Sequence, residues 1–215
     1  EPAQRRELSG VGAVRGGEFV EGAAEARARE HEAAAFAAAR GLGGRIVNVG
    51  GDLNGYGASR EQMIARFGAL CQRAGEQGLQ IALEIVAWGN VADVETALAV
   101  IADHPNAGVV IDCWHIFRGG VPLADLARIP ADRTYGVQIN DATAKPVAPL
   151  PEDTRRRLPC GQGAFDLMSF LSTLERMGVE RPVSVELINE EFAALPVETA
   201  ARISFESAAA VVRSA

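Results

Sequence analysis

Four short apolar segments of this chain each end in one polar side chain that can bind a metal ion. The segments are Ile81-Ala82-Leu83-Glu84, Val109-Val110-Ile111-Asp112, Tyr135-Gly136-Val137-Gln138 and Val183-Ser184-Val185-Glu186. A buried strand gains nothing from an unpaired carboxylate, because removing its charge from water costs several kcal/mol. Three acids and an amide at the ends of separate strands therefore suggest a shared ligand, and the simplest one is a divalent cation.

Strand-like and helix-like segments alternate along the chain. Predicted strands span residues 45–49, 80–86, 108–112, 135–139 and 182–187, with a sixth segment at 9–14. Predicted helices span residues 18–40, 59–77, 90–104, 122–128, 165–177 and 197–213. Ser59 and Gln62 have the spacing of a capping box, and Asn90 is a candidate cap for the next helix. Strict alternation indicates parallel strands joined by right-handed crossovers.

Two architectures satisfy this alternation, a closed (β/α)8 barrel and an open doubly wound sheet. In a barrel the C-terminal ends of the strands converge on one axis, so ligands from separate strands can meet at one ion. In an open sheet, residues several strands apart lie too far from one another. The four polar residues therefore favour an α/β fold of the (β/α)8 TIM-barrel type, with residues 1–215 in a single domain.

The chain is shorter than a complete barrel. A barrel usually needs about 250 residues, whereas this chain has 215. We therefore expect that about two βα units are missing at the N-terminus, given the eight-strand pattern. We favour a sequence that begins inside the domain; the alternative is an incomplete barrel, whose open strand edges would invite aggregation.

Composition excludes several classes of protein. The formal net charge is -7 and no cationic stripe is present, which argues against a nucleic-acid partner. No segment approaches the roughly 20 apolar residues of a membrane helix, so we expect no membrane partner. The cysteines lack a CxxC spacing, which disfavours a disulfide framework or structural zinc. Without a signal-peptide core at the N-terminus, we expect a cytoplasmic protein, and self-association into a homo-oligomer stays open.

From about residue 18 to its C-terminus, the chain resembles a known superfamily in five segments that occur in a specific order. They are Leu83-Glu84-Ile85, Asp112-Cys113-Trp114-His115, Gln138-Ile139-Asn140-Asp141, Leu158-Pro159-Cys160-Gly161-Gln162-Gly163 and Val185-Glu186. Together they resemble the xylose-isomerase-like TIM-barrel superfamily, the sugar phosphate isomerase/epimerase group. The order and spacing are specific to the superfamily and do not identify one substrate.

The resemblance implies a ligand set and a substrate contact. The metal ligands would be Glu84, Asp112, Gln138 and Glu186, and His115 would touch substrate. Many epimerases of the group have histidine where this chain has Gln138, whereas 3-dehydroshikimate dehydratases have glutamine. The late loop reads Gly161-Gln162-Gly163 where Gly-Glu-Gly is common. Both differences weaken the transfer of an epimerase activity.

The proposed ligands suit chemistry next to a carbonyl group. Hard oxygen ligands favour Mn²⁺, with Mg²⁺ or Co²⁺ as alternatives, over a structural zinc. The cation would polarise a hydroxy-ketone and stabilise the enediolate that forms when a neighbouring proton is lost. Glu84 and Glu186 could remove and return that proton from different sides. Its return to carbon gives an isomer, whereas loss of a hydroxyl gives a dehydration product.

Further polar and aromatic side chains are candidates for the substrate pocket. His115 could donate to a substrate oxygen or act as the acid for a leaving hydroxyl. The other candidate contacts are Asn48, Trp88, Trp114 and Arg157. Asn140 and Asp141 could orient Gln138 as hydrogen-bond partners, or could simply cap the loop. A structural alternative to the metal is that the strand-end carboxylates pair with arginines such as Arg118 or Arg157.

Three functions remain open from the sequence. The leading hypothesis is a divalent-metal-dependent isomerase or epimerase acting on a sugar or polyol ketone. The second is a metal-dependent dehydratase of the 3-dehydroshikimate or inosose type, a hypothesis that Gln138 favours. The third is a non-catalytic sugar-binding barrel that has lost turnover.

Overall fold

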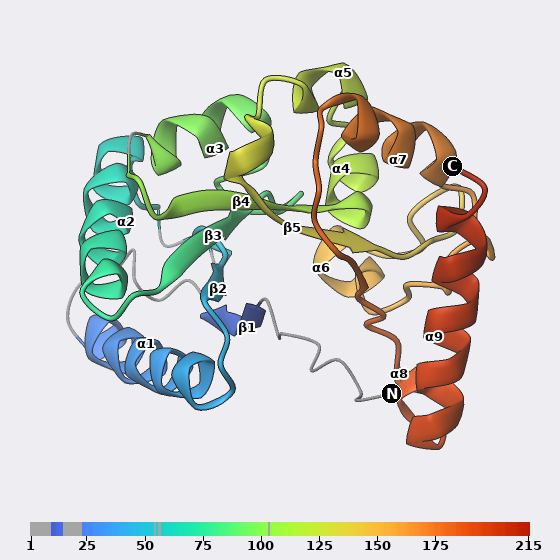
Figure 1. Ribbon diagram of the computed structural model, residues 1–215, viewed down its shortest axis with the longest axis horizontal. Coiled ribbons are helices and arrows are strands. Elements are labelled where there is room, and N and C mark those ends of the chain that lie inside the picture. Colours follow the sequence, from blue (N-terminus) through green and yellow to red (C-terminus); the bar gives the residue numbers. More distant parts are fainter. Residues whose placement is uncertain (1–9, 15–22, 54, 56, 103) are drawn as a thin grey trace, which may run out of the picture.

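A single six-stranded parallel sheet organises the chain. The computed structural model describes residues 10–14, 23–53, 55, 57–102 and 104–215. The strands are β1 (Gly10–Val14), β2 (Ile46–Val49), β3 (Gln80–Glu84), β4 (Ala107–Asp112), β5 (Thr134–Ile139) and β6 (Val183–Val185), paired in this order (Figure 1). The described residues thus supply six strands of a (β/α)8 TIM barrel, and they include the segment predicted near residues 9–14.

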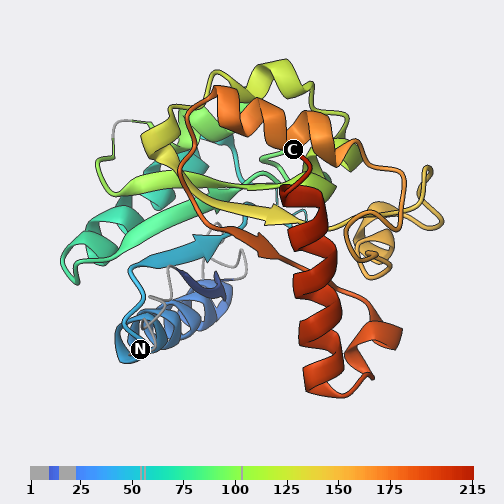
Figure 2. The ribbon, with the colours of Figure 1, turned by 45° about the vertical axis from the view of Figure 1, so that its right-hand side comes forward.

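The helices are α1 (Ala23–Gly41), α2 (Arg60–Gly75), α3 (Val94–Ile101), α4 (Cys113–Gly119), α5 (Leu123–Leu126), α6 (Leu150–Asp153), α7 (Leu167–Arg176), α8 (Glu190–Ala193) and α9 (Val197–Val212), with a 3-10 turn at Ala131–Arg133. The longer helices lie along the convex side of the curved sheet, as Figures 1 and 2 show from two directions, whereas the short helices α6 and α8 lie in the connections that follow β5 and β6. Among the described residues, no helix is both long enough and apolar enough to cross a bilayer.

The two faces of the sheet carry different residues because side chains alternate along a strand. Ile81, Leu83, Val109 and Ile111 belong to the large core that includes residues of the covering helices. A smaller cluster on the inner face comprises Ile46, Ala82, Val110 and Tyr135. The alternation therefore turns the residues of the large core toward the covering helices. The inner face of the sheet carries the smaller cluster and the polar residues at the strand ends.

One glycine is needed on the inner face. A Cβ atom added to Gly108 would lie 2.6 Å from the Tyr135 ring and 2.4 Å from the Arg133 carbonyl oxygen. Both neighbours are part of the packed sheet region, so they cannot both move aside without disturbing β4 and β5. Glycine here lets the Tyr135 ring fill the inner face beneath the strand ends.

The capping predictions had mixed outcomes. Ser59 caps α2, and its side chain and that of Gln62 form the predicted capping box. The prediction for Asn90 was wrong, because Asp93 caps α3 through the backbone N–H of Thr96 at 2.7 Å. The side chain of Asn90 instead accepts a hydrogen bond from the backbone N–H of Asp52 at 2.7 Å, which ties the loop after β3 to the loop after β2.

Several element boundaries also differ from the predictions. Helix α4 was not predicted, since it follows β4 without a connecting loop and is capped by Asp112 itself. The short helices α6 and α8 were not predicted either. Strand β6 is shorter than the predicted segment 182–187, so Glu186 lies just beyond its end. The predicted start of the first helix at residues 18–22, and residue 9, fall outside the described residues.

Candidate metal centre

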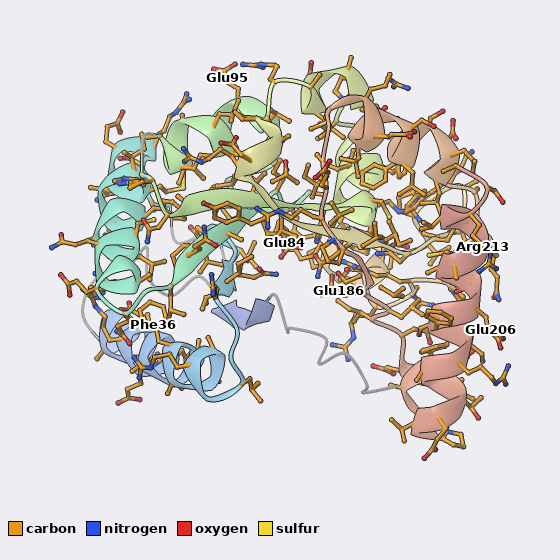
Figure 3. All side chains as sticks on the ribbon, in the orientation of Figure 1. Phe36, Glu84, Glu95, Glu186, Glu206 and Arg213 are labelled. Carbon is orange, nitrogen blue, oxygen red and sulfur yellow. The ribbon has the colours of Figure 1, made fainter. Side chains whose placement is uncertain are left out.

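The strand register places all four predicted metal ligands on the inner face. In the β4–β5 pair Asp112 is aligned with Gln138, and in the β3–β4 pair Glu84 is aligned with the residue two before Asp112. Glu186 lies two residues after the β6 residue that is aligned with Gln138. Steps of two residues keep a side chain on the same face. Figure 3 accordingly shows Glu84 and Glu186 near the middle of the molecule, while Glu95 and Glu206 lie at its periphery.

Asp112 is the most enclosed of the four residues, with no exposed surface. Its Oδ1 accepts hydrogen bonds from the Trp114 backbone N–H at 2.9 Å and from Asn140 Nδ2 at 3.1 Å. Its Oδ2 accepts a hydrogen bond from Arg157 Nη1 at 2.6 Å. Burial acts to raise the pKa of Asp112, but the charge of Arg157, together with hydrogen bonds from Glu186 and the Trp114 backbone N–H, outweighs it, so the pKa lies below its usual value.

Arg157 links Asp112 to Glu186. The same Nη1 atom that binds Asp112 donates to Glu186 Oε2 at 2.7 Å. The rest of the guanidinium is held by Thr154 Oγ1, 3.2 Å from Nε and 3.1 Å from Nη2, and by the Trp114 ring. The predicted alternative, carboxylate–arginine pairing, therefore occurs at Arg157. Arg118 instead forms an ion pair with Asp153, with an N–O distance of 2.8 Å, and does not pair with any of the four predicted ligands.

Glu84 lies on the other side of the centre, beside His115. Its Oε1 is 3.4 Å from His115 Nε2. The Nδ1 atom of His115 accepts a hydrogen bond from the backbone N–H of Ala87 at 3.3 Å, which favours the tautomer protonated at Nε2, although Nε2 also lies 3.4 Å from Arg157 Nη2. Burial lowers the pKa of His115 to about 4, so the ring is neutral at pH 7 and can donate from Nε2.

The two glutamates have unusually high pKa values. Burial, followed by the charges of Asp112 and Glu186, raises the pKa of Glu84 to about 8. Burial also raises the pKa of Glu186 to about 7, although the charge of Arg157 opposes this shift. Both carboxyl groups can therefore exchange protons near neutral pH, which is the property required of a general acid or base.

The donor set fits a divalent cation. Glu84, Asp112 and His115 each offer a ligand atom, and these atoms lie within 4.8 Å of one another. Gln138 Oε1 is buried and has no hydrogen-bond partner in the described part of the chain, so this oxygen is free to coordinate an ion on the inner face. Oxygen-rich sets of this kind suit Mg²⁺ and Mn²⁺.

The other predicted site residues have different positions. Asn48 is aligned with Ala82 in the β2–β3 pair, so it shares the inner face with Glu84. The Trp88 ring packs edge-on against His115, with ring centroids 5.1 Å apart. Trp114 is fully buried between His115 and Arg157, which makes it a support for both side chains. These contacts bring the predicted aromatic residues to one wall of the centre.

The predicted partners of Gln138 act elsewhere. Asn140 donates to Asp112 instead. Both carboxylate oxygens of Asp141 accept backbone N–H groups, from Ala142 and Phe165 on Oδ1 and from Gly161 on Oδ2. Asp141 therefore organises the loop that follows Arg157. The sequence reasoning missed Thr154, which lies in a Pro-rich connection with no periodic signal.

The fold and the strand-end residues define the class, a (β/α) barrel with an acidic site at the C-terminal ends of its strands. A family model described as xylose isomerase-like TIM barrel matches residues 7–211, and the chain belongs to this family. The resemblance seen in the sequence is thereby confirmed.

Named relatives of the chain are enzymes. It is 32% identical over 160 residues to a 3-dehydroshikimate dehydratase of Pseudomonas putida, which covers 72% of this chain and 25% of the relative. It is 31% identical over 139 residues to an inosose isomerase of Bacillus licheniformis, which covers 63% of this chain and 49% of the relative. The chain thus spans between a quarter and a half of these relatives.

Solved structures share the fold. A 1.8 Å crystal structure of the IolI protein with a binding zinc atom aligns with a TM-score of 0.84 and 23% identity, covering 96% of this chain and 76% of the other. At this identity the likeness establishes the shared barrel architecture.

Proposed function

We propose that the chain carries the catalytic centre of a divalent-metal-dependent isomerase or epimerase acting on a sugar-like or polyol hydroxy-ketone. The observation that carries this proposal is the placement of Glu84 and Glu186, two carboxyl groups with pKa values of about 8 and about 7, around the buried Asp112. Two such groups can take a proton from one carbon and return one to its neighbour. The inosose isomerase relatives support a polyol ketone as the substrate.

The ion would be held by Glu84, Asp112, Gln138 and Glu186, and when bound it would polarise the substrate carbonyl. We favour Mn²⁺, with Mg²⁺, Co²⁺ and Zn²⁺ as the other ions to test. Glu84 and Asp112, whose ligand atoms lie within 4.8 Å of each other, and the orphaned amide oxygen of Gln138 support this assignment, and Glu186 is connected to them through Arg157.

Each remaining side chain has a task in this proposal. Glu186 is oriented by Arg157, so it accepts the proton from the substrate carbon. Glu84, which lies beside His115, returns a proton to the neighbouring position. Neutral His115 donates from Nε2 to a substrate oxygen, and the Trp88 ring beside it limits access of water.

Deuterium exchange tests the proposal whichever product is formed. The chelator-treated protein, reloaded with Mn²⁺, is incubated in D₂O with inososes and ketoses while NMR follows carbon-bound hydrogen. We expect exchange at the carbon next to the carbonyl, and Glu84→Gln or Glu186→Gln should slow it by about 10²–10⁴-fold. Glu95→Gln, at an exposed position of α3, is the matched control and should exchange at the wild-type rate. Exchange that persists unchanged in both site variants would refute the proposal.

A dehydratase is the second candidate. Gln138 and the 32% identity to the Pseudomonas putida dehydratase favour it. In this reaction a glutamate takes the same carbon-bound proton, the hydroxyl leaves as water with a proton from a glutamate, and neutral His115 donates a hydrogen bond to the departing oxygen. A new ultraviolet absorbance from a conjugated double bond, with 3-dehydroshikimate as substrate, would identify the dehydratase. Tight sugar binding with neither exchange nor absorbance would instead indicate a non-catalytic barrel.

A further inference from the structure

On the basis of the metal site proposed above, we propose that Arg157 is a built-in cation that sets the charge of the centre and makes it prefer divalent over trivalent ions. Arg157 would thus be a specificity-determining residue for the metal, in addition to any contact it makes with substrate. The grounds are its fixed position, its sharing of two carboxylates and the resulting charge of the site.

Arg157 is held in place from several sides. Its side chain is 1% exposed, and a single nitrogen, Nη1, donates to both Asp112 and Glu186. Thr154 Oγ1 binds two further guanidinium nitrogens, and the Trp114 ring centroid lies 5.3 Å from the central carbon. A guanidinium does not lose its proton in proteins. The positive charge is therefore a permanent part of the centre.

A cation and Arg157 can bind Asp112 together. A carboxylate offers about four lone-pair sites. On Asp112, Oδ1 already accepts from Trp114 and Asn140, and Oδ2 accepts from Arg157. The carboxyl group of Glu186 also forms a hydrogen bond with Asp112, and an ion that replaces the proton of this bond requires no loss of the arginine contact. Arg157 thus stays beside the ion rather than being displaced by it.

The charge of the centre then matches a divalent ion. Glu84, Asp112 and Glu186 are the carboxylates, and Arg157 is the cation among them. When all three acids are ionised, one guanidinium leaves two negative charges, which a divalent ion neutralises. A trivalent ion would leave a buried positive charge uncompensated, and this is costly. Without Arg157 the balance would instead favour the trivalent ion.

Paired affinities for Mn²⁺ and Tb³⁺ test this inference. Both ions are titrated into chelator-treated protein, Tb³⁺ by luminescence sensitised through Trp88 beside His115 and Mn²⁺ by calorimetry. We expect Arg157→Gln to shift the affinity ratio toward Tb³⁺ by at least about tenfold, because a nearby unit charge acts strongly on the ion at low effective dielectric. Arg157→Lys, which keeps the charge, should keep the ratio near the wild-type value.

Arg155→Gln is the matched control. Arg155 lies two residues away, is exposed and pairs with exposed Glu190, so this change should leave the ratio unchanged. A ratio in Arg157→Gln within about twofold of wild type, while wild type binds Mn²⁺, would overturn the role of Arg157 alone. Wild-type protein that binds neither ion would overturn the metal site as well, so the two failures are distinguishable.

A second pair of variants covers the case in which Arg157→Gln does not fold. Glu186→Gln removes one carboxylate, and the double variant Glu186→Gln/Arg157→Gln then removes the cation without leaving an extra unpaired acid. The double variant should favour Tb³⁺ over Mn²⁺ more than Glu186→Gln does. Equal ratios in these two variants would refute the inference.

Discussion

The two sides of the candidate centre hold the same chemical group in different surroundings. Glu84 faces a neutral histidine at 3.4 Å and its side chain is 16% exposed, whereas Glu186 faces the Arg157 guanidinium at 2.7 Å and is 35% exposed. The better-solvated, cation-paired carboxyl has a pKa of about 7 and the more enclosed one a pKa of about 8. The protonation state of a strand-end acid is therefore set by its burial and by the charged groups beside it.

Removing the cation should produce the largest effect. Arg157→Met leaves Asp112 and Glu186 without their shared partner, so we expect the free energy of unfolding in chelator to fall by about 3–5 kcal/mol. Urea denaturation measures this change. Arg155→Met, at an exposed pair, should change stability by less than about 1 kcal/mol. Equal effects of the two substitutions would show that the Arg157 pairs do not differ from a surface contact.

The contrast between the glutamates should also be visible in the pH dependence of stability. Between pH 6.5 and 8, the folded protein keeps a proton on Glu84 that the unfolded chain, with an ordinary pKa of 4.5, has released. Stability of the metal-free protein should therefore fall as pH rises, by about 1.4 kcal/mol per pH unit for each glutamate that still holds its proton. His115 changes the stability in the opposite direction, but only at pH values below its ordinary pKa of 6.5.

Denaturation at several pH values in chelator measures this slope. Glu84→Gln should flatten most of it, whereas Glu186→Gln should change it mainly below pH 7, where the Glu186 carboxyl still holds its proton. A metal-free protein whose stability rises over this range would contradict the raised pKa values.

A substitution far from both sides should leave the slope unchanged. Ser59→Ala removes the side chain that caps α2, and we expect a loss of about 1 kcal/mol throughout the range from pH 6.5 to 8. Parallel stability curves for this variant and the wild type would assign the pH dependence to the centre. Curves that converge would place a titrating group near the α2 cap.

The strands and their end residues were predictable because they follow simple periodicities. Two-residue alternation and parallel pairing put Glu84, Asp112 and Gln138 on one face without any knowledge of loops. The Ser59 capping box was local and was also found. Asn90 failed as a cap because Asp93 is an equally good one closer to the helix, a choice that local sequence cannot settle.

The surroundings of the acids could not be predicted in the same way. Arg157 reaches Asp112 across 45 positions of sequence, from a loop whose path depends on the Asp141 backbone contacts and on Thr154. No periodicity connects these residues. The ligand candidates therefore came from the sequence, while the contacts that tune their charge required coordinates.

Metal binding by the chelator-treated chain tests most directly whether the strand-end residues share one ion. Mn²⁺ is titrated into wild type and into Glu84→Gln/Glu186→Gln, with binding followed by electron paramagnetic resonance. We predict saturation at about one ion per chain in wild type, as for a single-ion site, and a loss of this binding in the double variant. Binding of equal affinity and stoichiometry in both proteins would contradict a shared ion at these glutamates, as would no binding to the wild type.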